Sequence, residues 1–270
     1  MKRQRYFTAT FRFLFGVLVS CMAMSTHADT SRLDEILAAE RLRVCIWPDY
    51  YSISYRDPRS QELSGVDIFL ARELAKDLAV DVVFVDSSFA SVVGDVRSER
   101  CDVAMFAIGI TSERQKHLSF TEPHLMSDVL AITTRNNRAI RSWGDLDQPG
   151  NVVAVARGTV LEPLMRERLQ HAELIALDSP HARELEVISG RADAFITDLP
   201  YSIRMLETTD WARSVEPPDT YHVSYYAWAL KPGDPQWQAR LDAFMHAIKK
   251  DGRLLDAARK HGLEQAVVLE

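Results

Sequence analysis

Residues 67–85 of the chain read DIFLARELAKDLAVDVVFV. In the first part of this stretch, apolar side chains recur every three or four residues, which is the spacing of one helical face; they are Ile68, Ala71, Leu74, Ala75 and Leu78. The last part, residues 81–85, is β-branched and aromatic after one aspartate, which is typical of a strand. A helix followed directly by a strand is half of a β-α-β unit, so this stretch indicates an α/β fold.

Both flanks of this stretch extend the alternation. Short apolar runs at residues 42–46 and 103–108 predict two more strands, and residues 89–96 predict a second helix. The order β-α-β-α-β is typical of a parallel sheet covered on both faces. A second, smaller unit repeats the pattern, with strands predicted at 152–156, 174–177 and 194–197 and helices predicted at 159–169 and 181–189.

Two extended apolar runs, residues 129–134 and 223–230, lie on either side of the second unit. After them come a helix with Trp237, Leu241, Phe244 and Ile248 on one face and a shorter helix at residues 251–260. Two runs that flank an inserted unit predict two hinge strands between two α/β lobes. We assign residues 29–130 and 224–270 to lobe 1 and residues 131–223 to lobe 2, and we expect the C-terminal helices to return to lobe 1.

The first 28 residues have the pattern of a secretory signal peptide. An apolar run at 13–24 follows four basic residues, Lys2, Arg3, Arg5 and Arg12. No acidic residue comes before Asp29. Cleavage after Ala28 is one interpretation, and lipid anchoring at Cys21, which ends a Leu-Val-Ser-Cys stretch, is the other. Both place the globular part outside the inner membrane, so we predict a periplasmic protein.

The composition excludes several classes of protein. The chain has 270 residues, of which 47% are hydrophobic, with 11 Gly and 11 Pro, so collagen and low-complexity disorder are excluded. Without the predicted signal peptide, 28 of the 32 basic residues remain against 38 acidic ones, for a net charge of −10. Such a protein has no general attraction to nucleic acid or to anionic membranes. We expect a monomer without a cofactor.

Cys45 and Cys101 are the two cysteines beyond the predicted signal peptide. A pair of cysteines in an oxidising compartment is compatible with one disulfide, and two buried free thiols are the alternative. Neither residue has a Cys or His at metal-ligand spacing, so no metal site is predicted.

Candidate binding residues follow the predicted strands, because ligands of open α/β sheets bind at the carboxyl ends of strands. Gly109, Thr111 and Arg114 follow residues 103–108, and the fork of Arg114 suits a carboxylate. Gly158 and Thr159 follow residues 152–156 at a predicted helix start, which is an arrangement that holds anions.

Two further strand ends carry candidates. Asp198 follows residues 194–197 and has the charge to bind an ammonium group, and the first strand is followed by aromatic residues that include Trp47 and Tyr50. Each of these residues also has a structural interpretation: Thr159 and Asp198 as N-caps, Arg114 as a surface residue, and the aromatic rings as packing. Taken together, however, they match a zwitterion with an α-carboxylate and an α-ammonium.

Several motifs carry a family resemblance; they are SGVDI at 64–68, ITSERQ at 110–115, FTEP at 120–123, GT at 158–159 and GRADAFITD at 190–198. In these motifs the chain resembles the family 3 extracytoplasmic solute-binding proteins, the periplasmic components of polar amino-acid ABC transporters, over residues 31–265. The resemblance implies the two-lobe type II fold of periplasmic binding proteins and an ABC permease as partner. It also implies that Arg114 holds the α-carboxylate with help from Thr159, that Asp198 holds the ammonium, that Tyr50 stacks on the side chain, and that the lobes close over the ligand.

The chain departs from this family at the segment that contains Phe106, Ala107 and Gly109, where members that bind polar amino acids often have hydroxyl residues. The departure favours an apolar or aromatic ligand, and Trp47 agrees with it.

Two branches of the family offer alternatives. The cyclohexadienyl (prephenate or arogenate) dehydratases resemble the opening SRLD at 31–34, but their catalytic glutamate, three residues after Asp198, is replaced here by Tyr201. We therefore predict no catalytic residue and a protein that is not an enzyme. The second branch accompanies quinoprotein alcohol dehydrogenases and shares LRVC at 42–45 and CDV at 101–103, which supports a bridge between Cys45 and Cys101. An accessory role beside such a dehydrogenase is the alternative function.

Overall fold

The computed structural model describes residues 30–269. The predicted signal peptide, the cleavage point after Ala28 and the anchoring residue Cys21 lie outside the described residues. Among the helices that the structure describes, none has the length and apolar character needed to cross a membrane.

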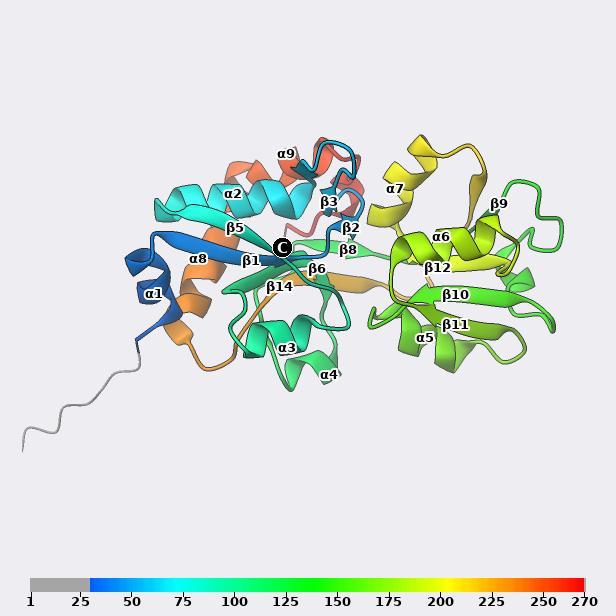
Figure 1. Ribbon diagram of the computed structural model, residues 1–270, viewed down its shortest axis with the longest axis horizontal. Coiled ribbons are helices and arrows are strands. Elements are labelled where there is room, and N and C mark those ends of the chain that lie inside the picture. The colour runs from blue at the N-terminus through cyan, green and yellow to red at the C-terminus, as the bar shows by residue number, and fades with distance from the viewer. Residues whose placement is uncertain (1–29, 270) are drawn as a thin grey trace, which may run out of the picture. The chain divides into compact units, whose positions relative to one another are not determined.

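The first sheet has six strands in the order β5-β1-β6-β14-β7, with β8 also paired to β14. The strands β1, β5 and β6 are parallel, whereas β14 runs antiparallel to β6, β7 and β8. Their bounds are β1 Arg41–Ile46, β5 Asp81–Asp86, β6 Val103–Gly109, β7 Ser119–Phe120, β8 Leu125–Ser127 and β14 Ser224–Leu230. This sheet lies in the left half of Figure 1.

The second sheet has five strands in the order β11-β10-β12-β9-β13. The strands β10, β11 and β12 are parallel, and β9 pairs antiparallel with both β12 and β13. Their bounds are β9 Val129–Thr134, β10 Val152–Ala156, β11 Glu173–Leu177, β12 Ala194–Asp198 and β13 Ala212–Val215. Both sheets are therefore mixed, and each contains the parallel core that the alternating pattern predicts.

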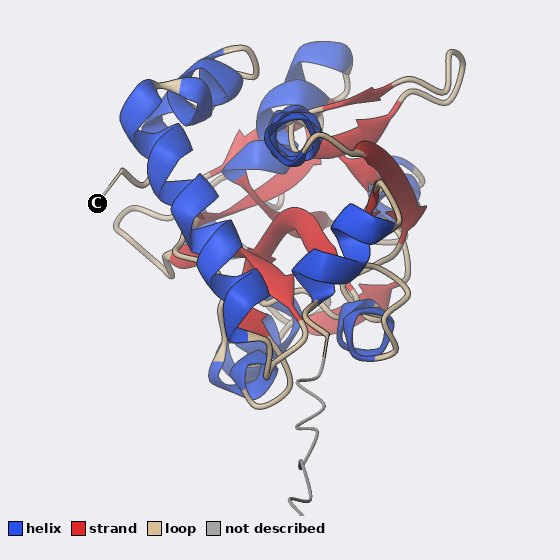
Figure 2. Cartoon of the chain, turned by 90° about the vertical axis from the view of Figure 1, so that its left-hand side faces the viewer, coloured by secondary structure: helices blue, strands red, loops and turns tan. Residues whose placement is uncertain are grey.

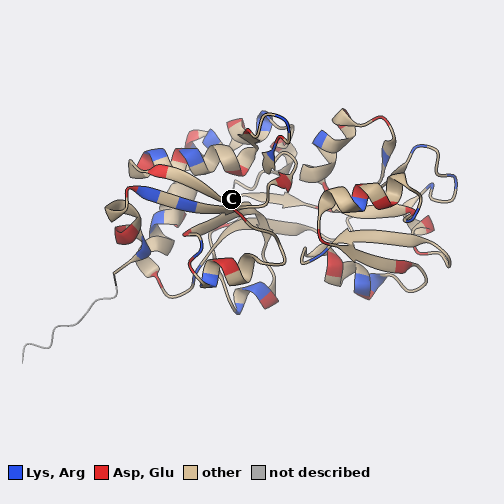
Figure 3. Ribbon diagram, in the orientation of Figure 1, with Lys and Arg blue, Asp and Glu red and all other residues tan. Residues whose placement is uncertain are grey.

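The helices surround the strands, as Figure 2 shows. Their bounds are α1 Arg32–Ala38, α2 Val66–Leu78, α3 Val92–Arg97, α4 Ser112–Gln115, α5 Leu161–Arg168, α6 Pro180–Ile188, α7 Leu199–Thr208, α8 Pro235–Asp251 and α9 Arg253–Arg259, with short 3₁₀ turns η1 Trp143–Asp145 and η2 Glu264–Ala266. The apolar face predicted for α2 is buried, and the C-terminal helices α8 and α9 pack against α1 and α2 as expected. Charged residues lie mainly on the helices and loops, whereas the strands carry few of them (Figure 3).

The buried apolar side chains form two clusters. The larger one includes side chains from both sheets and from α2, α6, α7, α8 and α9. The smaller one lies under α5, on the opposite face of the second sheet. The boundaries that we assigned to the two lobes stay a prediction; below, lobe 1 and lobe 2 denote the parts built on the first and the second sheet.

Cys45 in β1 and Cys101 just before β6 are joined by a disulfide, with their Cα atoms 5.5 Å apart. The bond links neighbouring strands, because β1 pairs with β6 directly after Cys101. The alternative of two free thiols is therefore wrong for this structure.

Three details differ from the predictions. The helix expected at 89–96 begins at Val92, because Ser88 and Ser91 form a turn in which the Val92 N–H donates to the Ser88 carbonyl at 2.9 Å. The helix expected at 159–169 begins at Leu161, so Thr159 is not its N-cap. A small sheet of β2 Asp49–Tyr50, β3 Ser54–Arg56 and β4 Leu63–Ser64 was not predicted, because strands of two or three residues are too short to show an alternating pattern.

Candidate functional site

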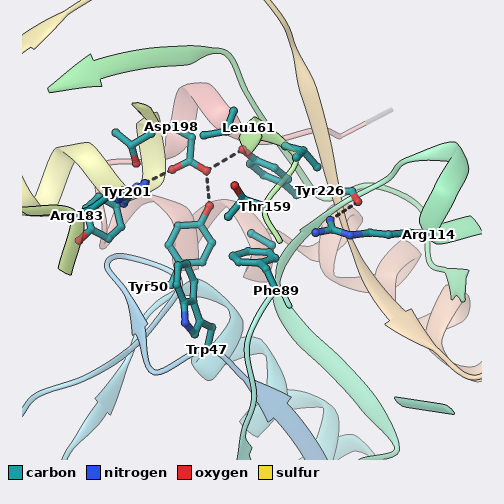
Figure 4. Close-up of a pocket in the computed structure, with 14 residues that line it drawn as sticks. Trp47, Tyr50, Phe89, Arg114, Thr159, Leu161, Arg183, Asp198, Tyr201 and Tyr226 are labelled. Atoms are coloured by element: carbon teal, nitrogen blue, oxygen red, sulfur yellow. Dashed lines mark hydrogen bonds between the residues drawn. The ribbon is translucent and has the colours of Figure 1, made fainter. Parts of the chain in front are cut away.

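A pocket lies between the two sheets, at the carboxyl ends of β1, β6, β10 and β12. Side chains from both lobes line it (Figure 4). Six of the predicted site residues are among them: Trp47, Tyr50, Gly109, Arg114, Thr159 and Asp198. Strand ends that are far apart in the sequence thus meet at one place, as the rule for open α/β sheets predicts.

Arg114 projects into this pocket from α4 and is only 8% exposed. Its Nη1 donates to the Gly109 carbonyl at 2.7 Å, and its Nη2 crosses to lobe 2 and donates to the Gly158 carbonyl at 2.8 Å. The guanidinium also lies 5.5 Å from the centre of the Phe89 ring. Burial lowers the pKa of Arg114 to about 10, so the group is still a cation at neutral pH.

The interpretation of Arg114 as a surface residue is therefore wrong. Within the described part of the chain, no carboxylate lies within 4.0 Å of its guanidinium nitrogens. Two backbone carbonyls are its recorded acceptors, and a guanidinium has five N–H donors. The remaining donors and the positive charge are free to meet a ligand.

Asp198 lies across the pocket from Arg114 (Figure 4). It is the N-cap of α7, where its Oδ1 accepts from the Tyr201 N–H at 3.2 Å, so the N-cap interpretation is confirmed. Its Oδ2 accepts two phenolic hydroxyls, one from Tyr50 of lobe 1 and one from Tyr226 of β14 at 2.8 Å. Burial raises the pKa of Asp198, and these hydrogen bonds oppose that shift only in part.

Aromatic rings form the wall beside Tyr50. The Trp47 and Phe89 rings meet edge to face with centroids 4.8 Å apart, and Phe89 meets Phe106 in the same way at 5.0 Å. Phe106 is fully buried behind this wall and does not line the pocket itself. The predicted aromatic character of the site thus comes from Trp47, Tyr50 and Phe89, with Phe106 as support.

A buried polar network supports the pocket from behind. Ala107 lines the pocket with a positive φ of 48°, and its N–H donates to the Asp67 carboxylate at 2.8 Å. The other oxygen of Asp67 contacts His124 Nε2 at 3.0 Å and accepts from Trp228 Nε1 at 2.8 Å. The contacts of Asp67 with the Ala107 N–H and with His124 tie α2 and the loop before β8 to the strand end that carries Ala107. They stabilise the unusual backbone conformation of Ala107.

Gly158 and Thr159 have roles other than those expected from a helix N-terminus. The Thr159 hydroxyl donates to the Ala156 carbonyl at 2.8 Å, which closes the turn before α5. Gly158 has a φ of +75° and lies against the backbone of Ala90 in lobe 1. It does not line the pocket, but its carbonyl is the acceptor for Arg114.

Thr111 also stays outside the pocket. It is the N-cap of α4, and its Oγ1 accepts from the Arg114 N–H at 3.1 Å. Its contribution is to orient the helical turn that carries Arg114.

Sequence reasoning missed several lining residues, among them Phe89, Arg183 and Tyr226. Phe89 lies in a loop, Arg183 lies within α6, and Tyr226 lies in a strand predicted only as a hinge. Nothing in the local sequence of Phe89 or Arg183 marks a site. For Tyr226, an aromatic residue in the second hinge strand was the one signal available.

No group of three or more potential metal-ligating side chains occurs among the residues that the structure describes.

Comparison with known proteins gives a match over most of the chain. The model of the bacterial extracellular solute-binding proteins, family 3, matches residues 42–264. The chain belongs to this family. The predicted family and its type II two-lobe fold are confirmed, and the extracellular nature of the family agrees with the predicted export.

The relatives include both an enzyme and binding proteins. Cyclohexadienyl dehydratase of Pseudomonas aeruginosa is 29% identical over 260 residues, which cover 94% of this chain and 96% of that protein. The L-cystine-binding protein of Escherichia coli is 24% identical over 243 residues, 90% of each chain. The crystal structure of an ancestral amino acid-binding protein, a precursor of cyclohexadienyl dehydratase, superposes with a TM-score of 0.79 at 30% identity and covers 86% of this chain and 99% of that one.

Proposed function

We propose that this chain binds an amino acid or a related small carboxylate between its two lobes and delivers it to the permease of an ABC transporter. The observation that carries this proposal is Arg114, a buried cation at the pocket wall with no carboxylate partner among the described residues. The names of two relatives, one an L-cystine-binding protein and one an ancestral amino acid-binding protein, support the same class of ligand.

The physical argument concerns the cost of burying a charge. A guanidinium that leaves water loses its hydration, and two carbonyl acceptors replace only part of it. A ligand carboxylate would accept from the remaining N–H donors and neutralise the charge in a site of low dielectric. The bond from Arg114 to Gly158 joins the lobes, so the same residue would couple ligand binding to closure around β9 and β14 as hinges.

The test replaces Arg114 by methionine, which keeps most of the side-chain volume and removes the charge. Charge-assisted hydrogen bonds contribute about 1.5–3 kcal/mol each, so losing a two-bonded carboxylate should weaken binding by roughly a hundredfold to ten thousandfold. Arg138→Met is the matched control, because Arg138 is exposed and remote from the pocket lining.

Binding is measured by calorimetry after a thermal-shift screen of residues 29–270 against small carboxylates, including the twenty amino acids. A hundredfold excess of ligand over Kd stabilises the native state by about 2.7 kcal/mol, which a melting curve detects readily. If Arg114→Met binds the best carboxylate within threefold of the Arg138→Met control, the proposed site is wrong.

Dehydratase activity is the second candidate function, and the 29% identical relative favours it. Against it, Tyr201 occupies the position predicted for the catalytic glutamate. Its hydroxyl donates to Glu184 Oε1 at 2.6 Å, and burial raises its pKa, so it is a poor proton donor at neutral pH. Incubation with prephenate and arogenate followed by chromatography separates the two functions, since a binding protein leaves both unchanged.

The accessory role beside a quinoprotein alcohol dehydrogenase stays a prediction. Copurification with such an enzyme would test it.

A further inference from the structure

The carboxylate of Asp198 is already occupied by protein donors. Two phenolic hydroxyls, from Tyr50 and Tyr226, donate to Oδ2, and the Tyr201 N–H donates to Oδ1. The side chains of Asp198, Tyr50 and Tyr226 are all at least 90% buried. Three hydrogen bonds from the protein thus occupy most of the acceptor sites of this carboxylate.

An ammonium group bound here would need further acceptors. It has three N–H donors, and each one buried without a partner is costly. Side chains at Ala107 and Gly109 carry no oxygen, and the carbonyl of Gly109 accepts from Arg114 Nη1. The strand end that carries Ala107 and Gly109 therefore offers no side-chain acceptor for an α-ammonium, and the side-chain hydroxyls nearest in the lining are those of Thr159, Thr197 and the tyrosines.

The charges of the lining residues give an independent argument. Arg114 and Arg183 are the two cations of the pocket lining, both over 90% buried, and Asp198 is its one acidic residue. Glu184, which accepts the Tyr201 hydroxyl, lines a separate pocket on the other side of Tyr201. The lining thus carries a net charge of +1.

Arg183 has no carboxylate partner within 4.0 Å among the described residues. Its Nη1 donates to the Ile196 carbonyl at 2.7 Å, and its guanidinium carbon lies 4.6 Å and 4.8 Å from the ring centres of Phe195 and Tyr201. Its Nε is buried without an acceptor. This cation lies near Asp198, and it would repel an ammonium approaching that carboxylate.

We infer that the ligand is an aromatic or apolar monocarboxylate without an ammonium group, such as a 2-oxo acid or an aryl-alkanoic acid. This inference rests on the proposed function and narrows its ligand class. Arg114 binds the carboxylate, the wall of Trp47, Tyr50 and Phe89 packs on the apolar body, and the ligand charge of −1 balances the lining. Asp198 acts as a positioning residue that orients the Tyr50 and Tyr226 rings.

The test compares ligands that differ only at the α-carbon. Calorimetry measures how the ammonium group changes the affinity in two series of ligands. One series is phenylpyruvate, 3-phenylpropanoate and L-phenylalanine, and the other is 4-methyl-2-oxopentanoate and L-leucine. At least one amine-free acid should bind ten times or more tightly than its amino acid. Tighter binding of the amino acid in both series overturns this inference and leaves the proposed function intact. If none of these acids and none of the twenty amino acids binds, both fail.

A second variant tests the part played by Asp198. Asparagine is as good an N-cap as aspartate, so Asp198→Asn should fold. Asp234→Asn is the matched control, because Asp234 is the N-cap of α8 and accepts from the Trp237 N–H at 2.9 Å outside the pocket.

The two possible ligand classes predict different results for this variant. Because Asp198 orients the Tyr50 and Tyr226 rings, Asp198→Asn should change the affinity for an amine-free acid and for its amino acid by similar factors. A zwitterion held by Asp198 would in addition lose its ammonium partner. A loss of affinity for the amino acid that exceeds the loss for its amine-free counterpart by tenfold or more, with the control unchanged, overturns the inference.

Discussion

Gly158 allows a test of the contact between the two lobes that does not touch the ligand. A Cβ atom added to Gly158 would lie 2.6 Å from the backbone nitrogen and 2.7 Å from the Cα of Ala90 in lobe 1. Ordinary contacts of a Cβ begin at 3.4 Å, so the two backbones would have to separate by about 0.8 Å. The change Gly158→Ala is small, but it should hold the lobes apart.

The size of the effect follows from the bond between Arg114 Nη2 and the Gly158 carbonyl. This bond is 2.8 Å long, and a separation of about 0.8 Å would lengthen it beyond the limit of a hydrogen bond. A hydrogen bond to a charged group contributes about 1.5–3 kcal/mol. If ligand binding depends on that bond, Gly158→Ala should weaken binding by roughly tenfold to a hundredfold.

The control variant accounts for the conformational cost of placing alanine where glycine has a positive φ. Alanine at a positive φ costs roughly 1–2 kcal/mol in any protein. Gly190 has a φ of +74°, almost the same as the +75° of Gly158, and a Cβ there would have nothing within 4 Å. Gly190→Ala therefore carries the conformational cost without the clash.

Both variants are measured by denaturant unfolding and by calorimetric titration with the best ligand from the screen. Gly190→Ala should lose only the conformational cost in its free energy of unfolding, whereas Gly158→Ala should lose that cost and up to about 1.5–3 kcal/mol more for the broken bond. Only Gly158→Ala should lose affinity. Equal affinities in the two variants would refute the idea that binding depends on the approach of lobe 2 to Ala90.

The disulfide and a surface charge network allow two further predictions. Cys45 and Cys101 are 56 residues apart, so in the chain-entropy model their bond contributes about 4 kcal/mol, and reduction should lower the free energy of unfolding by up to that amount in denaturant titrations. Hydrogen bonds from Lys231 and Arg32 lower the pKa of Glu99 to about 2, so the stability that this carboxylate contributes is present above pH 4.5 and is lost as the pH falls toward 2. Glu99→Gln should therefore lower the free energy of unfolding by under about 1 kcal/mol at pH 7 and leave it unchanged near pH 2. A difference in unfolding free energy between variant and parent that does not change with pH would contradict this.

The local sequence predicted most of the secondary structure. The apolar face of α2 and the apolar runs of β1, β6, β10 and β12 depend on the side chains of one element, and periodicity reports these directly. Arg114 and Asp198 were found for the same reason, because each follows a strand and the ends of parallel strands lie at one edge of a sheet. Errors arose where a few residues form a turn, as at Thr159, whose hydroxyl closes a turn before the helix begins.

The tertiary structure alone decided which groups these residues meet. Periodicity carries no information on how two lobes approach, so the sequence left Asp198 as a free acceptor for an ammonium. The folded chain instead brings to it the hydroxyls of Tyr50 and Tyr226, which are 148 and 28 residues away. Arg183 enters the same pocket from within a helix, where its spacing marks only a buried face. The sequence by itself determined that the cation Arg114 follows a strand end, where it lines the pocket. The packing of distant segments decided the charges that surround it, because hydrogen-bond partners across lobes depend on strand pairing and lobe contact rather than on neighbours in the chain.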